Sequence, residues 1–172
     1  MAYAEKSNTI SLSKHRATSH GFQRLYAEGM ELVEQTATYL DGEGRERAKS
    51  LSRENATFYA AESMRLTTRL MQVASWLLLQ RALNNGEMSL EQVLAEKTKV
   101  RFENKTVDLD TENWAALPLE FTDLVRRSLR LQDQIRQMDQ ELFGTADTVK
   151  TNAANQNPVG SQIRLLNTAF GG

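Results

Sequence analysis

The chain has 172 residues, a net charge of −1 at pH 7, 40% hydrophobic residues, 25% charged residues and no cysteine. This length allows one domain with a buried core, and the small net charge excludes a global basic field that would attract nucleic acid or anionic lipid. The absence of cysteine excludes a disulfide framework and thiolate chemistry. Because the chain has only two prolines and many helix-favouring residues, we expect an all-α fold.

Residues 1–18 are polar and show no periodicity, which predicts a disordered N-terminal tail. The tail has no apolar core, so we expect no secretory signal. No apolar run in the chain reaches the roughly 18 residues that a membrane span needs, and we expect a cytoplasmic protein. A first helix is predicted over 19–41, with Ser19 as its N-cap and Asp41-Gly42 at its end. Its apolar face consists of Phe22, Leu25, Tyr26, Leu32, Val33, Tyr39 and Leu40.

A long second helix is predicted over 45–85, where Asn84-Asn85-Gly86 is a strong C-terminal signal. Residues 43–50 are polar and form either a connection or the first turn of this helix. At the centre of the helix the apolar stripe widens to cover most of the circumference, which requires two partner helices and favours a second copy of the chain. We therefore expect a homodimer, with a dimer or core surface made of Val73, Trp76, Leu77, Leu78 and Leu79.

A short helix is predicted over 89–98, because Ser89 and Gln92 have the spacing of a capping box. Residues 100–114 are predicted to be a loop, with a weak hairpin as the alternative. A third helix is predicted over 117–143, with Pro118 in its first turn, an ion pair between Asp123 and Arg127, and Gly144 at its end. Its apolar seam consists of Phe121, Leu124, Ser128, Leu131, Ile135, Met138 and Leu142.

These elements predict a three-helix bundle with a short extra helix and a long loop before helix three, occupying 19–144 between flexible tails. Residues 145–172 are polar and Asn-rich, which is typical of a flexible C-terminal tail. Apolar residues return near its end, around Arg164. The tail either folds back on the bundle, hangs free, or is a tethered recognition peptide that orders on binding a partner. The residues of the last interpretation are Ile163, Arg164, Leu165, Leu166 and Phe170.

No motif in the sequence predicts catalysis, a cofactor or a metal site. His15 and His20 are the only histidines, and their spacing does not suit one helical face. Glu62 lies among apolar residues, and we expect it at the bundle edge or hydrogen-bonded inside it rather than in catalysis. The row of Arg65, Arg69 and Arg81 suggests a phosphate-binding edge, but arginine stems often cover an apolar stripe, so we do not expect nucleic acid as a partner.

One stretch of the second helix resembles a known family. Residues 62–81, ESMRLTTRLMQVASWLLLQR, and the following Gly86-Glu87-Met88-Ser89 are similar to the RcdA family of alphaproteobacteria, the regulators of CtrA degradation. Tyr39-Leu40-Asp41-Gly42 and Gly44-Arg45 also fit the family's exit from helix one. The resemblance runs from about Phe22 to Gly144 and is strongest in the long helix.

The resemblance implies a homodimeric three-helix bundle with a mobile C-terminal segment. It also implies a non-enzymatic adaptor of the ClpXP protease that acts with the response regulator CpdR at a cell pole and delivers cargo such as CtrA. Delivery of CtrA involves a further partner that binds cyclic di-GMP, and no site for that nucleotide is evident in this sequence. Two alternatives are a helical dimerisation scaffold and a DNA-associated regulator, neither with a link to a protease. The partners that the protein binds distinguish these alternatives. Salt-dependent binding to DNA would identify the DNA-associated regulator.

Overall fold

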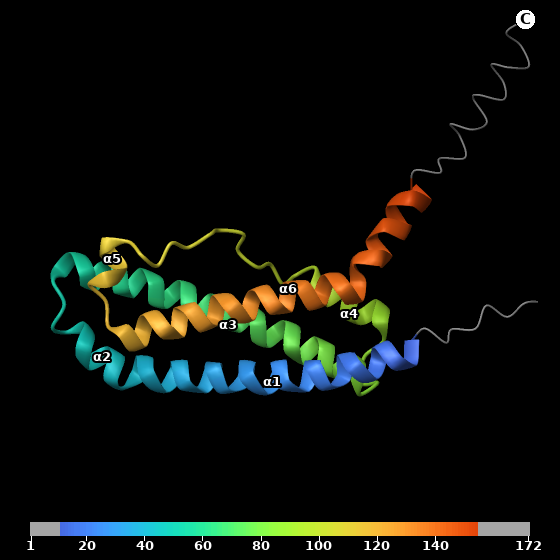
Figure 1. The fold of residues 1–172 in the computed structure, drawn as a ribbon, viewed down its shortest axis with the longest axis horizontal. Helices are drawn as coiled ribbons and strands as arrows, with labels where there is room; N and C mark the ends of the chain where they lie inside the picture. Colours follow the sequence, from blue (N-terminus) through green and yellow to red (C-terminus); the bar gives the residue numbers. More distant parts are fainter. Residues whose placement is uncertain (1–10, 155–172) are drawn as a thin grey trace, which may run out of the picture. The chain divides into compact units, whose positions relative to one another are not determined.

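The computed structural model describes the backbone of residues 11–154 and the side chains of residues 20–144. Within this part of the chain all regular secondary structure is helical (Figure 1). The long helices are α1 (Ser11–Asp41), α3 (Arg53–Asn84) and α6 (Leu119–Ala154), and the short ones are α2 (Glu43–Ala48), α4 (Leu90–Lys97) and α5 (Glu112–Ala115). The predicted all-α bundle with a long loop before the last long helix is confirmed.

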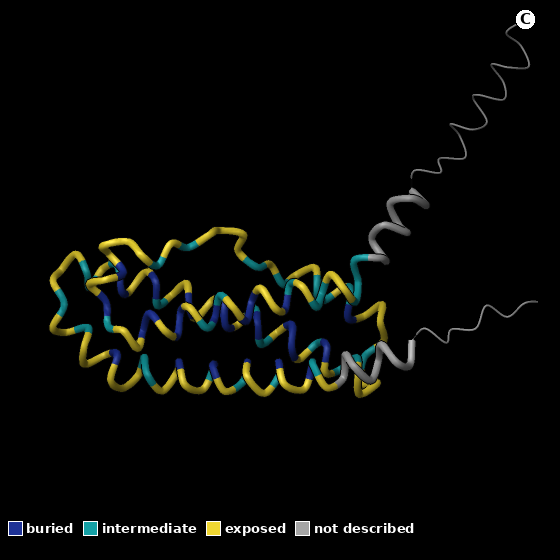
Figure 2. Tube along the Cα trace, viewed as in Figure 1, coloured by how far each residue is buried: buried dark blue, intermediate teal, exposed yellow. Residues whose placement is uncertain are grey.

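The core lies where α1, α3 and the first part of α6 face one another. The contacts divide the chain into the units Met1–Ile135 and Arg136–Gly172, and the core belongs to the first. Buried segments of the three helices point inward, and exposed segments point to solvent (Figure 2). Burying one large apolar side chain stabilises a fold by about 1.5–3 kcal/mol, so this core is the main stabilising feature. Its largest fully buried side chains are Trp76, Phe121, Leu32, Leu66, Leu77, Leu131, Ile135, Val73, Val93 and Val125.

Helix α3 is bounded by a capping serine at its start and a left-handed glycine after its end. The Ser52 side chain accepts a hydrogen bond from the Asn55 backbone N–H, at 3.2 Å, and so caps the first turn. At the other end Gly86 has a φ of 71°, a left-handed conformation that glycine adopts without strain. Residues 43–50, which the sequence left open between a connection and a first turn, contain the separate short helix α2.

Helix α1 approaches α3 closely at Gly29. A Cβ atom at this position would overlap the Leu77 side chain and would lie 3.6 Å from Leu131 Cδ2 on α6. Gly29 is therefore the point at which all three long helices meet, and its missing side chain is what lets Leu77 sit between them.

The connection between α3 and α6 contains two short helices. Helix α4 begins with the predicted capping box, in which Ser89 and Gln92 bond reciprocally. Residues 101–108 have no regular structure, so the loop is observed and the alternative hairpin is not. Helix α5 places Trp114 under this connection, where its ring stacks against Phe121 with centroids 6.3 Å apart.

Helix α6 shows the predicted seam in its first half and departs from prediction at its end. Phe121, Leu124, Ser128, Leu131 and Ile135 are all buried. The helix does not end at Gly144 but continues to Ala154, because a single glycine costs a helix only about 1 kcal/mol and no proline follows at once. Likewise α1 begins at Ser11 rather than Ser19, since the residues before Ser19 are polar but compatible with helix.

Candidate partner-binding surfaces

The outer face of α3 exposes large apolar side chains. Met64, Met71 and Leu78 are 72%, 66% and 50% exposed, although they lie on the helix that supplies the largest share of the core. Scattered exposed apolar residues are normal, but apolar residues aligned on one face often mark a contact with another protein. This face is therefore the first candidate surface.

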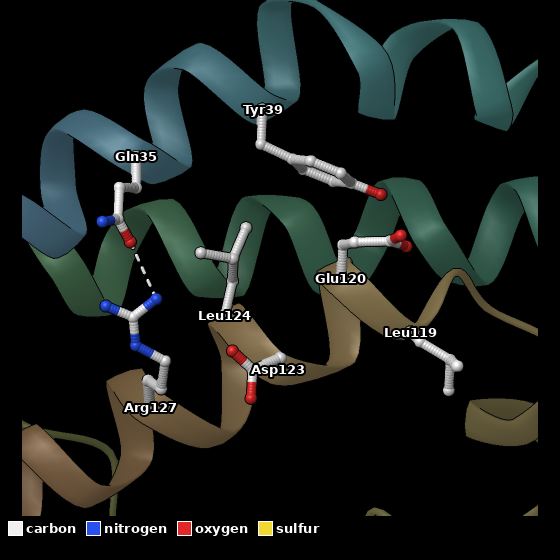
Figure 3. A pocket seen from close by; sticks show the side chains of 7 residues that line it. All are labelled: Gln35, Tyr39, Leu119, Glu120, Asp123, Leu124 and Arg127. Atoms are coloured by element: carbon white, nitrogen blue, oxygen red, sulfur yellow. Dashed lines mark hydrogen bonds between the residues drawn. The ribbon is translucent and has the colours of Figure 1, made fainter.

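A groove between α1 and α6 is the second candidate surface (Figure 3). Its volume is about 500 Å³. Arg127 Nη1 on α6 donates a hydrogen bond to Gln35 Oε1 on α1, at 2.7 Å, and closes the groove on one side. The expected ion pair between Asp123 and Arg127 is not made, since Asp123 lies 3.8 Å from Arg126 instead. The groove is lined by Gln35, Tyr39, Leu119, Glu120, Asp123, Leu124 and Arg127.

Leu119 marks this groove as a candidate contact site. Its side chain is 82% exposed, the largest exposure among the described large apolar residues. It is the first residue of α6 and follows Pro118, whose fixed φ suits a helix start. Glu120 and Asp123 line the same groove, and the Leu119 side chain points away from their carboxylates (Figure 3). A groove lined by an exposed leucine and two carboxylates suits a partner surface that offers both apolar area and a positive charge.

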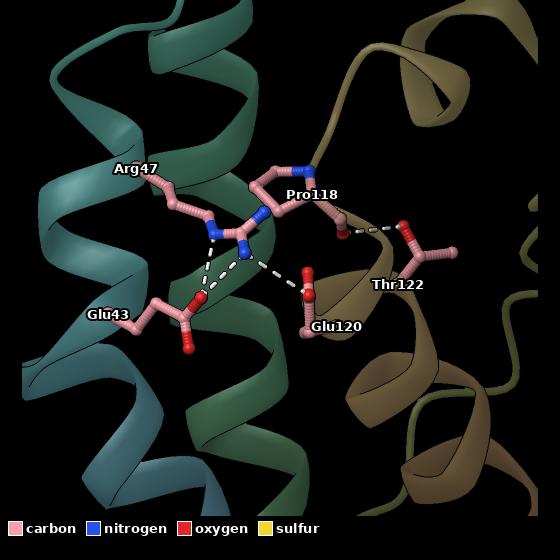
Figure 4. Close-up of polar contacts among 5 residues, drawn as sticks. All are labelled: Glu43, Arg47, Pro118, Glu120 and Thr122. Atoms are coloured by element: carbon pink, nitrogen blue, oxygen red, sulfur yellow. Dashed lines mark hydrogen bonds and ion pairs between the residues drawn. The ribbon is translucent and has the colours of Figure 1, made fainter.

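Arg47 ties α2 to the start of α6 (Figure 4). Its Nε and Nη2 donate to Glu43 Oε1 at 2.9 and 2.6 Å, and Nη2 also lies 3.3 Å from Glu120 Oε1. The hydrogen bond to Glu43, followed by the charges of Glu120 and Glu43, raises the pKa of Arg47. Thr122 Oγ1 donates to the Pro118 carbonyl at 3.4 Å in the first turn of α6. Exposed ion pairs contribute little stability, so we assign this cluster a positioning role at the groove.

Two tyrosines lie behind the groove with buried hydroxyl groups. Neither Tyr39 Oη nor Tyr59 Oη has a hydrogen-bond partner. A Cβ atom at Gly44 on α2 would overlap the Tyr39 ring and the Tyr59 hydroxyl group, so the glycine lets α2 close over them. Burial, with smaller contributions from Tyr59 and Glu120, raises the pKa of Tyr39 from 10.0 to about 12, and burial also raises the pKa of Tyr59.

This arrangement predicts a loss of stability in alkaline solution. A raised pKa means that the folded state favours the protonated phenol, so the stabilisation is complete below pH 10 and is lost as the pH rises from 10.0 to about 12. Tyr39→Phe should flatten the fall in unfolding free energy across this interval, measured by urea denaturation at several pH values. An unchanged slope in the variant would show that Tyr39 titrates normally.

The structure places the predicted dimer or core residues in different environments. Val73, Trp76 and Leu77 are buried inside the bundle, Leu79 is half-buried, and Leu78 is exposed. Most of the widened apolar stripe is thus covered within one chain. The predicted tail residues lie outside the described part of the chain, and they are Ile163, Arg164, Leu165, Leu166 and Phe170.

The polar residues singled out on α3 do not come together as one edge. Glu62 is buried and ion-paired with Arg65. Arg69 is buried and donates to Ser128 Oγ on α6 at 3.0 Å, and its burial lowers the pKa of its guanidinium. Arg81 donates to Tyr26 Oη on α1 at 2.7 Å. Arg69 and Arg81 therefore join α3 to its neighbours, whereas the contact of Arg65 lies within α3.

Within the described residues there is no cluster of metal-ligating side chains and no helix that could cross a membrane. His20 is exposed, and the side chain of His15 lies outside that range.

Sequence reasoning missed Met64, Met71 and Leu119. The two methionines and Leu78 recur every seven residues, so their common face could have been read from the sequence. The exposure of Leu119 had no local signal, because it depends on where α1 lies.

The protein is an all-α helical bundle with exposed apolar residues on its surface. A family model described as "Protein of unknown function (DUF1465)" matches residues 13–170. The crystal structure of RcdA from Caulobacter crescentus CB15 is 46% identical in sequence, with a TM-score of 0.60, and the match covers 73% of this chain and 94% of that chain. No curated protein matches. The chain therefore belongs to the RcdA family, which confirms the resemblance.

Proposed function

We propose that this protein is a non-enzymatic adaptor that delivers cell-cycle proteins, such as the transcription regulator CtrA, to the ClpXP protease. It acts with a CpdR-like response regulator, as a homodimer in the cytoplasm that is recruited to a cell pole. The observation that carries this proposal is the 46% identity with RcdA over 94% of that chain. In this proposal the tail residues 163–170 contact one partner and the bundle contacts another.

The bundle offers features that suit an adaptor. Arg69 and Arg81 on α3 hold helices together, whereas Met64, Met71 and Leu78 on the same helix are exposed. We assign the groove between α1 and α6 to a partner protein, with Leu119 as the apolar anchor and Glu120 and Asp123 facing a positive charge. Tethering two partners on one scaffold raises their effective concentration without any chemistry.

A matched pair of variants tests this assignment in reconstituted degradation of a cargo by ClpXP and activated CpdR. Leu119→Asp should lower the affinity for the partner about tenfold, because losing an interface anchor costs about 1.4 kcal/mol. The fold should tolerate it, since Leu119 is 82% exposed and a carboxylate is favourable in the first turn of a helix.

Leu90→Asp is the control. Leu90 is 51% exposed and is also the first residue of a helix, but α4 lies at the other end of the bundle from the start of α6 (Figure 1). Cargo degradation should slow with Leu119→Asp and stay near the parent rate with Leu90→Asp. Equal rates for the two variants would remove the groove from the proposal.

A further inference from the structure

The connection between α4 and α5 contains a segment without regular structure, residues 101–108, which we call the strap. It runs back from α4 towards α5 along the bundle, drawn out rather than folded on itself (Figure 1). Only Phe102 and Val107 are half-buried, and the other residues of the strap are exposed. Because it buries little apolar surface, the strap should open more readily than the helices beside it.

Three polar side chains where α3 meets α6 lie next to the strap, and we call them the strap site: Arg69, Ser128 and Gln132. Each of them is at most 5% exposed. Arg69 Nη1 donates to Ser128 Oγ at 3.0 Å, and Ser128 Oγ donates to the Val125 carbonyl at 2.7 Å. Gln132 Nε2 donates to the backbone carbonyl of Glu103 in the strap, at 3.2 Å. Buried polar groups of the bundle thus hold the backbone of the strap.

The buried guanidinium of Arg69 requires a carboxylate nearby. Burial lowers the pKa of Arg69, and the charge of Glu103, followed by that of Glu62, opposes this change. Glu62 is already ion-paired with Arg65. Since a buried charge without compensation is costly, the carboxylate that the strap brings is a main reason why the strap lies here.

The Gln132 amide is satisfied on one side only. Its Nε2 donates to the strap, but its Oε1 is buried and has no hydrogen-bond partner. A side-chain amide has both an acceptor and donors, so it can bond the N–H as well as the C=O of an extended backbone. The strap supplies the C=O alone. Because an unmet buried acceptor lowers stability, a segment that supplies both groups would have an advantage over the strap.

We propose that the strap site binds an extended acidic segment of another protein, and that the strap occupies this site in the isolated chain as an internal competitor. The bound segment places a carboxylate at Arg69 and its backbone C=O and N–H at the Gln132 amide. Apolar residues near that carboxylate take the places of Phe102 and Val107. Backbone bonds supply affinity in such a contact, and the side chains at defined positions supply selectivity.

A fluorescein-labelled peptide with the sequence of residues 99–110, KVRFENKTVDLD, is the probe. Fluorescence anisotropy measures its binding to the full chain. The parent should bind it weakly, because the strap of the parent competes for the same site. The Glu103→Gln chain should bind it at least about tenfold more tightly, because the apparent affinity rises with the fraction of chains whose site is open. Glu103 is exposed, so the variant should fold, and circular dichroism checks this.

Two controls test the role of the carboxylate. The Asp108→Asn chain loses another exposed carboxylate of the strap but keeps the oxygen that accepts from the Asp110 backbone N–H, so it should bind the peptide as the parent does. A second peptide that carries Glu103→Gln should bind the Glu103→Gln chain at least about tenfold more weakly than the first peptide, because it leaves the charge of Arg69 without compensation. Equal affinities of the parent and the Glu103→Gln chain, or of the two peptides, would overturn the proposal.

NMR of the isotope-labelled parent chain shows whether the peptide and the strap compete for one place. With saturating unlabelled peptide, the amide signals of residues 101–108 should move to the positions of an unstructured chain, while those of α4 stay unchanged. Strap signals that do not move while the peptide is bound would place the peptide elsewhere and refute the strap site. These measurements contain no protease and no cargo, so their failure would leave the adaptor function untouched, and failure of the adaptor function would leave the strap site.

Discussion

Leu77→Asp is expected to abolish the folded state. Leu77 is fully buried and fills the space that Gly29 leaves between the long helices. Truncating a buried leucine already costs about 2–5 kcal/mol, and a buried carboxylate without a partner adds several more. Since a domain of this kind is stable by only about 5–15 kcal/mol, we expect little helical signal to remain. Circular dichroism with thermal denaturation measures this directly.

The neighbouring residue provides a strict comparison. Leu78→Asp places the same carboxylate one position further along α3, where the side chain is 50% exposed. That variant should fold with a melting temperature close to that of the parent. If Leu77→Asp instead stayed folded and only lost its dimer, Leu77 would belong to an interface between copies and not to the core.

The contrast between Leu77 and Leu78 separates what the sequence of α3 predicted from what it could not predict. The apolar run around Trp76 correctly indicated that the helix needs cover on several sides. It did not show that other helices of the same chain cover Val73, Trp76 and Leu77, whereas Leu78 remains exposed. Packing within a chain and packing between copies both require apolar residues on a helix face. Only the arrangement of the helices in space distinguishes the two.

Local signals predicted element boundaries well where a side chain bonds to the backbone. Ser89 and Gln92 form the expected capping box, and Gly86 supplies the expected left-handed residue after α3. Gly144 failed as a stop signal, because no left-handed turn or cap forms there and α6 continues. A glycine alone only lowers helix propensity, whereas a boundary requires a competing set of hydrogen bonds.

The candidate surfaces differ in how predictable they were. The exposed row of Met64, Met71 and Leu78 lies on one helix, so its spacing was present in the sequence. The groove joins Gln35 and Tyr39 to residues on α6 that are far away in the chain, and nothing local in either segment indicates it.

The removal of residues 155–172 is expected to have the largest effect on function. Because α6 continues to Ala154, truncation after that residue leaves the helix whole. The truncated chain should keep the melting temperature of the parent but lose cargo delivery, since it lacks the proposed recognition residues Ile163, Leu165, Leu166 and Phe170. Delivery at the parent rate would transfer the recognition role from these residues to the bundle. A matched full-length variant with Ile163, Leu166 and Phe170 changed to serine separates the role of these side chains from that of tail length.

The most direct test of the adaptor hypothesis is the rate at which ClpXP degrades a cargo such as CtrA in the presence of activated CpdR. For CtrA the reactions also contain the cyclic di-GMP-binding partner and its nucleotide, and the only variable is this protein. We predict that the full chain accelerates degradation by at least about tenfold, as expected when a scaffold raises the effective concentration of a cargo at the protease. A degradation rate that is the same with and without the full chain would contradict the adaptor function.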